Sequence, residues 1–161
     1  MTLFVAIAIL AAGAWFVTGR DATPEPQTNP EGKPSQVGPS TPPPPIVKAT
    51  YDNATEDMIV VTTPLPGATS SRIVEVEGRA RGNWYFEANF PIEIQSPEGD
   101  VLVRIGVQAK GPWMTTEFVP FSASLTLPPN YHGPATLILR NDNASGLPEY
   151  DRSVSIPIVV Q

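Results

Sequence analysis

Two carboxylates, Glu87 and Glu93, are the first candidates for acid–base chemistry in this sequence. They are six residues apart in residues 83–94, whose alternation of apolar and polar side chains predicts a strand with both carboxylates on its solvated face. Six residues of strand correspond to about 20 Å, whereas two carboxylates acting on one glycosidic bond stand about 5–10 Å apart. We therefore interpret both as solvated strand carboxylates and not as a catalytic pair.

The chain has a single histidine, His132, and no cysteine. One histidine cannot build a His-rich metal centre, and a chain without cysteine forms no disulfide, thiolate metal site or lipidated cysteine. A Ser-His-Asp triad could include His132, but no nucleophile-elbow motif supports one. We therefore expect a protein that is not an enzyme and that needs no cofactor.

Residues 141–151 are rich in side-chain oxygens of the kind that Ca²⁺ binds. The candidate ligands are Asp142, Asn143, Glu149 and Asp151. Their spacing does not match an EF-hand loop, and Asx side chains in turns commonly bond their own backbone. A self-bonded turn is the favoured interpretation, and a calcium-dependent carbohydrate-binding or hydrolytic site that uses the 141–151 loop is the alternative.

A candidate partner-binding surface comprises Arg79, Arg81, Tyr85, Glu87 and Trp113. The first four are expected to project outward from strands, and the tryptophan follows a Gly-Pro pair in a loop. Arginine and aromatic side chains are the usual anchors of protein interfaces. The alternative is that the arginines pair with Glu87 across neighbouring strands and that Trp113 is tucked in.

The strand that is expected to organise the sheet is residues 83–94. Its buried face is predicted to carry Trp84, Phe86, Ala88, Phe90, Ile92 and Ile94. Its wet face is predicted to carry Tyr85, Glu87, Asn89, Glu93 and Gln95. A strand with several large aromatic and β-branched anchors on one face is typical of the centre of an antiparallel sheet. We expect the centre of the core to consist of Trp84, Phe86, Phe90 and Phe121.

The same period of two recurs along residues 46–161, and no helical period is found there. Seven strands are predicted, at 58–61, 72–81, 83–94, 101–110, 118–127, 135–139 and 154–160. Turn signals separate them at fairly regular intervals. This pattern predicts an all-β fold, a seven-stranded immunoglobulin-like antiparallel sandwich, with a small barrel as the alternative.

The first 45 residues have a different composition. Residues 1–18, with a continuous apolar run at 3–17, are expected to be a single-pass transmembrane helix or a signal peptide cut after Ala14, and we favour the anchor. Residues 19–45 contain nine prolines and few apolar side chains, which predicts a disordered linker. We therefore expect a cell-membrane protein with its C-terminal domain extracytoplasmic, or a secreted one if the N-terminal segment is cleaved.

The formal net charge is −6, with 10 basic and 16 acidic residues. Without a basic stripe the chain has nothing to release counterions from a phosphate backbone. Nucleic acid is therefore not an expected partner.

Residues 78–91, 111–121 and 141–149 together resemble the immunoglobulin-like domain family described from bacterial spore germination proteins. The resemblance spans about residues 58–160. It implies a bacterial, extracytoplasmic β-sandwich without an established catalytic activity or ligand. We expect a membrane-tethered binding or scaffolding module of the bacterial envelope, whose partner is an envelope protein or a glycan, and we carry over no role in germination.

Overall fold

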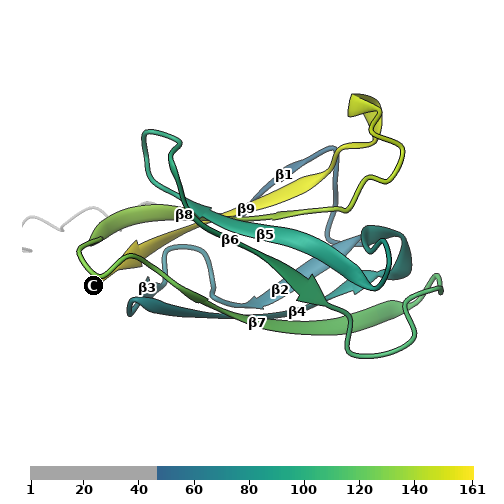
Figure 1. Ribbon diagram of the computed structural model, residues 1–161, viewed down its shortest axis with the longest axis horizontal. Helices are drawn as coiled ribbons and strands as arrows, with labels where there is room; N and C mark the ends of the chain where they lie inside the picture. Colours follow the sequence, from purple (N-terminus) through teal and green to yellow (C-terminus); the bar gives the residue numbers. More distant parts are fainter. Residues whose placement is uncertain (1–46) are drawn as a thin grey trace, which may run out of the picture. The chain divides into compact units, whose positions relative to one another are not determined.

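The computed structural model describes residues 47–161 (Figure 1). The expected membrane segment at 1–18 and linker at 19–45 lie outside the described residues. Among the residues that are described, no helix has the length and apolar character needed to cross a membrane.

Residues 47–161 form nine strands and two short 3₁₀ turns. The strands are β1 (Thr50–Asp52), β2 (Ile59–Thr63), β3 (Thr69–Ser70), β4 (Ile73–Arg81), β5 (Asn89–Gln95), β6 (Val101–Gln108), β7 (Phe118–Thr126), β8 (Gly133–Arg140) and β9 (Ser153–Val160). The turns are η1 (Gly82–Trp84) and η2 (Pro148–Tyr150). Six of the seven predicted strands lie within two residues of their expected bounds, whereas the strand predicted at 83–94 begins only at Asn89. β1 and β3 are additional short strands at a sheet edge.

The strands form two sheets packed face to face. One has the order β1-β9-β8-β5-β6, with β3 also on β9, and the other has the order β2-β4-β7. All pairs are antiparallel except the two-residue pairing of β3 with β9. The prediction of an all-β sandwich of two antiparallel sheets is therefore confirmed (Figure 1).

The core lies between the inner faces of the two sheets. Phe90 is fully buried at its centre, and its ring meets the rings of Tyr85 and Phe121 edge to face, with centroid distances of 5.1 Å in both pairs. Trp84 is also buried, at 1% exposure. The predicted core centre is correct for Trp84, Phe90 and Phe121.

The prediction for residues 83–88 is wrong in register. The strand begins at Asn89 and not at Asn83, and a two-residue turn at Glu87 and Ala88 precedes it. The turn breaks the alternation, so Tyr85 is buried at 3% exposure while Phe86 is exposed at 42%, the reverse of the expectation.

Glu93 is a second correction. It points to the outer face of the larger sheet, as expected, but it is only 1% exposed and is not solvated. Arg104 on β6 and Arg140 on β8 cover it from both sides. The sequence identified the face that Glu93 occupies but not the two side chains that close over it.

Candidate functional site

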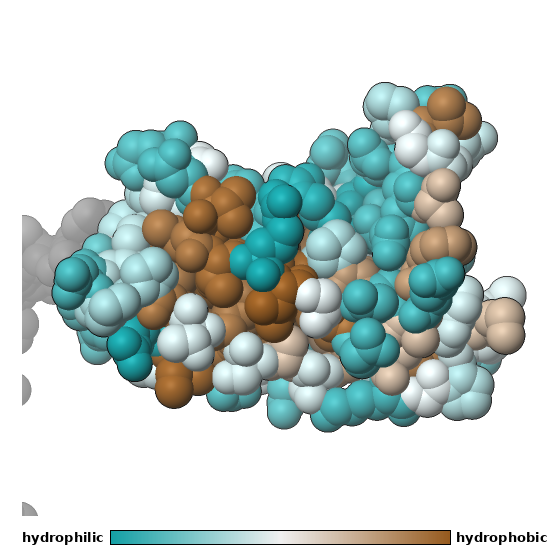
Figure 2. All heavy atoms as spheres, viewed as in Figure 1, coloured by the Kyte–Doolittle hydropathy of each residue, from teal (hydrophilic) through white to brown (hydrophobic). Residues whose placement is uncertain are grey.

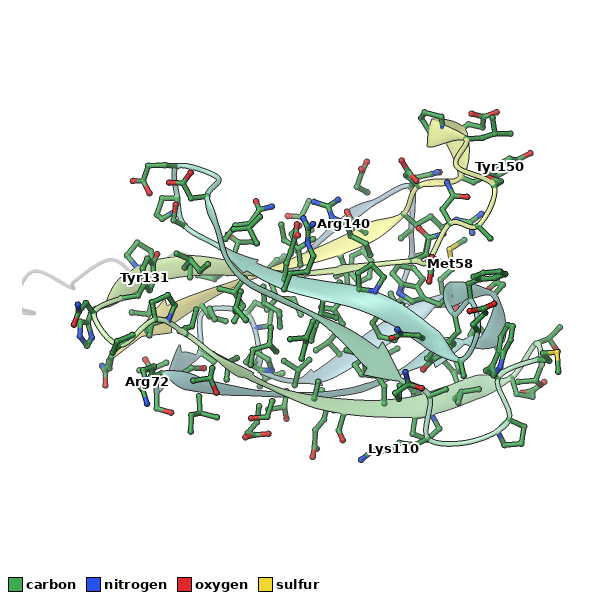
Figure 3. The ribbon with its side chains drawn as sticks, viewed as in Figure 1. Met58, Arg72, Lys110, Tyr131, Arg140 and Tyr150 are labelled. Carbon is green, nitrogen blue, oxygen red and sulfur yellow. The ribbon has the colours of Figure 1, made fainter. Side chains whose placement is uncertain are left out.

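Both sets of candidate site residues lie at one end of the sandwich. Four segments connect the strands at this end, which we call the loop end: residues 53–58, 82–88, 109–117 and 141–152. The 96–100 turn and the C-terminus lie at the other end (Figure 1), and Val47 lies there beside Gly67 and Pro97. Figure 3 shows Met58 and Tyr150 at the loop end, with Arg72 and Tyr131 at the opposite one. The antiparallel topology thus brings together segments that are far apart in the sequence.

Hydrogen bonds join the four segments of the loop end to one another and to β4. The bonds run from Asn53 Nδ2 to the carbonyl oxygens of Glu149 and Asp151, both at 3.0 Å, from Asp142 N to Trp84 O at 3.0 Å, and from Arg81 Nε and Nη1 to the carbonyl oxygens of Asp57 and Thr116, both at 2.9 Å. Loops braced in this way hold their side chains in defined positions, as a recognition surface on a rigid scaffold requires.

Arg79 and Arg81 both stack on Phe118. The guanidinium carbons lie 5.0 Å and 4.1 Å from the centroid of the ring, within the range of a cation–π interaction. Arg81 Nη1 also lies 3.9 Å from a carboxylate oxygen of Glu117. Neither arginine pairs with Glu87, so the alternative of cross-strand Arg–Glu87 pairs is wrong. The reason is that Glu87 lies in the turn before β5 and not on a strand beside β4.

Glu87 and Ala88 form the centre of a tight turn. Their φ angles are 50° and 62°, and the backbone N–H groups of Phe86 and Asn89 each donate 2.9 Å hydrogen bonds to the carbonyl oxygen of the other. Two central residues with positive φ define a type I′ turn, which normally uses Asn-Gly or Asp-Gly. Positive φ at non-glycine residues is unfavourable and is often found at functional sites. The turn holds Phe86 and Glu87 at the surface.

Tyr85 does not belong to the exposed surface. Its hydroxyl donates a 2.9 Å hydrogen bond to the carbonyl oxygen of Val119 in the core. Burial disfavours the phenolate and raises the pKa of Tyr85 to about 12. The expectation that Tyr85 projects outward as part of a partner-binding surface is therefore wrong, and the side chain fastens the loop end to β7.

Trp113 is half-buried and packs against the core. Its segment is anchored by Gly82, at which an added Cβ would lie 2.1 Å from the Trp113 carbonyl oxygen and 2.0 Å from that of Thr115. The next residue, Met114, is 85% exposed. The 109–117 segment therefore presents Met114 fully and Trp113 in part.

The polar side chains of the 141–151 loop bond within the loop. Asn143 Nδ2 donates to Leu147 O and to Asp151 Oδ1, both at 2.8 Å, and Asn143 Oδ1 accepts from the Ser145 hydroxyl at 2.6 Å. In residues 47–161, no three His, Cys, Asp or Glu side chains are grouped so as to hold a metal ion. This geometry matches the self-bonded turn, the favoured interpretation of the sequence.

Glu93 is the most tightly held carboxylate among the described residues, and sequence reasoning missed its role. Arg104 Nε donates to its Oε2 at 2.6 Å, and Arg140 Nη2 donates to its Oε1 at 3.0 Å. Burial raises the pKa of Glu93, but the hydrogen bonds and charges of the two arginines outweigh it, so the pKa is lowered. The one available signal was the alternation of residues 101–110, which places Arg104 on the face opposite Val103 and Ile105.

Sequence reasoning also missed the exposed apolar side chains of the loop end. These are Phe86, Met114, Leu147 and Tyr150, exposed by 42%, 85%, 48% and 50%. Single exposed apolar residues are ordinary. Here four of them lie on three loops at the same end of the domain.

Two comparisons bear on the family of this chain. No curated protein matches it in sequence. A family model described as an immunoglobulin-like domain of bacterial spore germination matches residues 58–146, more than half of the 161 residues. The match runs from the residue before β2 to the middle of the loop after β8, ending before the expected limit near residue 160. The chain therefore belongs to the immunoglobulin-like domain family of bacterial spore germination.

Proposed function

We propose that this chain is a membrane-tethered, extracytoplasmic immunoglobulin-like module of the bacterial envelope that binds a partner protein through its loop end. The observation that carries the proposal is the group of exposed apolar side chains on hydrogen-bonded loops, made up of Phe86, Met114, Leu147 and Tyr150. Large apolar and aromatic side chains on a braced scaffold supply contact area at low entropic cost, as interface anchors do.

The charge of the loop end indicates the kind of partner. Its four segments contain seven acidic residues, namely Glu56, Asp57, Glu87, Glu117, Asp142, Glu149 and Asp151, against two basic ones, Lys110 and Arg152. A surface that combines exposed apolar side chains with acidic ones is complementary to a protein surface that is apolar and basic. Arg79 and Arg81, stacked on Phe118 beside the 109–117 segment, offer a second contact for an acidic or aromatic group.

The position of Val47 supports the tethered arrangement. Val47 lies beside Gly67 and Pro97, at the end of the sandwich opposite the loop end. A tether made of residues 1–46, with its apolar run at 3–17, would therefore be attached to the domain at the end that does not carry the loop end.

Site-specific photo-crosslinking of the full-length chain in bacterial cells tests the contact surface. A photoreactive residue in place of Phe86 or Tyr150 is expected to form a crosslink to a partner protein. Matched controls are Leu65 and Ile73, which are exposed by 65% and 48% at the other end of the sandwich. The crosslink formed from position 86 should weaken with Tyr150→Ser, and the crosslink formed from position 150 should weaken with Phe86→Ser. Added salt should weaken both. Equal crosslinking at all four positions would exclude a loop-end interface, and a glycan partner would leave no crosslinked protein.

The absence of cysteine allows a clean test of the location. A single Gln161→Cys substitution gives a full-length chain with one thiol. A membrane-impermeant maleimide is expected to label that thiol in intact cells, with a cytosolic cysteine protein as the control that reacts only after lysis. Labelling of Gln161→Cys only after lysis would contradict an extracytoplasmic domain.

A further inference from the structure

The β6 edge of the larger sheet is the most prominent feature that the proposed function leaves unused. β6 pairs with β5 on one side, and in residues 47–161 no strand pairs with its other side between Arg104 and Val107. β7 joins that side only at the end of β6, through the antiparallel bridge of Ala109 with Phe121, which engages the backbone of Gln108 and Lys110. Figure 1 shows β6 and β7 meeting at that end and diverging toward the start of β6.

The hydrogen bonds at the end of β6 reveal which backbone groups are free. Ala109 N donates to Ala88 O, toward β5, whereas Lys110 N donates to Pro120 O, toward β7. Successive residues of a strand direct their backbone groups to opposite edges. Gln108, Gly106 and Arg104 therefore share the direction of Lys110. Gln108 belongs to the bridge with β7, whereas the N–H and C=O groups of Gly106 and Arg104 point to the open edge. Such a row of groups is a template for another strand.

The side chains along β6 are unusually apolar for an open edge. Val101 is 46% exposed, and Leu102, Val103 and Ile105 are partly buried against the core. Figure 2 shows apolar residues gathered on the half of this face where β6 crosses in front. Natural edge strands are usually protected by proline, by lysine or by being very short. β6 has eight residues, no proline and one charge, Arg104.

The edge could be occupied by β6 of a second copy of the chain or by a strand of another protein, and the charge of Arg104 distinguishes the two. Its side chain is 59% exposed on the outer face of the sheet, although it is also bound to Glu93. If β6 paired about its midpoint with β6 of a second copy, the two Arg104 side chains would meet on one face, and like charges in such positions are destabilising. A carboxylate on an added strand would instead meet Arg104 favourably.

We propose that the β6 edge binds an extended acidic segment of a partner protein by strand addition. The segment has no proline, places apolar side chains at alternate positions against Val103 and Ile105, and carries a carboxylate on the other face near Arg104. Backbone hydrogen bonds to Arg104 and Gly106 hold it, and the alternating side chains give it its register. This surface is distinct from the loop end.

A fluorescent synthetic peptide, Thr-Val-Thr-Val-Glu-Val-Thr-Val-Thr, tests the proposal with the full-length chain in detergent. Fluorescence polarisation is expected to show binding with a dissociation constant in the micromolar range. Two N-methylated versions block alternate sets of amides. One set faces β6, and its methylation is expected to weaken binding by about tenfold or more, whereas methylation of the other set leaves binding intact. Lys in place of the central Glu should weaken binding about two- to fivefold.

Variants of the chain complete the test. Val101→Glu places a negative charge on the β6 edge, where it repels the carboxylate of the peptide, and is expected to weaken binding by about tenfold. Val159→Glu is the matched control, since Val159 is 40% exposed on β9, away from this edge, and binding should be unchanged. The proposal is overturned if the peptide does not bind at about 1 mM or if both methylated versions bind equally. It is also overturned if the chain forms dimers that Val101→Glu dissociates.

Discussion

Glu93 on β5 lies directly opposite Arg104 on β6, and Arg104 Nε donates a 2.6 Å hydrogen bond to Glu93 Oε2. Arg140 reaches the other carboxylate oxygen from β8. One buried carboxylate thus links three adjacent strands on the outer face of the larger sheet.

Replacing Glu93 by Gln is expected to lower the free energy of unfolding at pH 7 by about 1–3 kcal/mol, because charge-assisted hydrogen bonds to both arginines are lost. Urea denaturation measures the change. Glu77→Gln is the matched control, since Glu77 is exposed on β4 and should change stability by about 0.5 kcal/mol or less.

The loss of unfolding free energy caused by Glu93→Gln should depend on pH. The arginines lower the pKa of Glu93 below its ordinary value of 4.5 despite burial, so its ionised form stabilises the fold. That stabilisation is present above pH 4.5 and is lost as the pH falls through the lower pKa of the folded state. The difference between the natural chain and Glu93→Gln should therefore shrink as the pH is lowered below 4.5. A constant difference would contradict this account.

Phe90 and Phe86 should respond very differently to truncation. Phe90→Ala removes a fully buried ring from the core centre and is expected to cost about 3–5 kcal/mol. Phe86→Ala removes a side chain that is 42% exposed and should cost about 1 kcal/mol or less. Denaturation of both variants measures the contrast. Equal losses would mean that Phe86 is a core residue, as the alternation in the sequence suggested.

Gly82 should not tolerate even an alanine. An added Cβ would lie 2.0 Å and 2.1 Å from two backbone carbonyl oxygens of the 109–117 segment, which cannot move aside as a flexible side chain can. Gly82→Ala is expected to destabilise the fold by about 1–3 kcal/mol. At Gly111 an added Cβ meets nothing within 4 Å, so Gly111→Ala is the control and should be nearly neutral. Thermal denaturation of the two variants decides the point.

The hydroxyl of Tyr85 should contribute about 1 kcal/mol to the free energy of unfolding. Urea denaturation of the natural chain and of Tyr85→Phe at pH 7 measures this difference. Its pKa of about 12 in the folded chain exceeds the ordinary value of 10, so the neutral form is favoured by folding. This contribution is present below pH 10 and is lost as the pH rises toward 12. A difference that grows between these two pH values would show that the hydroxyl is not held as the structure indicates.

Calcium should leave the stability of the chain unchanged. The loop that contains Asp142, Asn143, Glu149 and Asp151 uses much of its side-chain hydrogen-bonding capacity internally. Thermal denaturation with excess Ca²⁺ and with a chelator should therefore give the same midpoint. A rise in the midpoint with Ca²⁺ that Asp151→Asn abolishes would revive the calcium-dependent alternative.

The sequence alone was sufficient to predict the two-sheet sandwich, because alternation of side chains directly reflects which face of a strand is buried. Phe90, Ile92 and Ile94 on β5 follow the predicted pattern, and each is fully buried. Alternation is a local property, so it can be read without knowing how the strands pair.

Only the tertiary structure determined the positions of Tyr85, Phe86 and Glu93. The turn at Glu87 and Ala88 has no glycine or asparagine to announce positive φ, so its interruption of the alternation leaves no mark in the sequence. Burial of Glu93 depends on strand register, which places Arg104 and Arg140 beside it from distant parts of the chain. The loop end likewise exists because antiparallel pairing gathers four connections at one end, an arrangement that no single stretch of residues encodes.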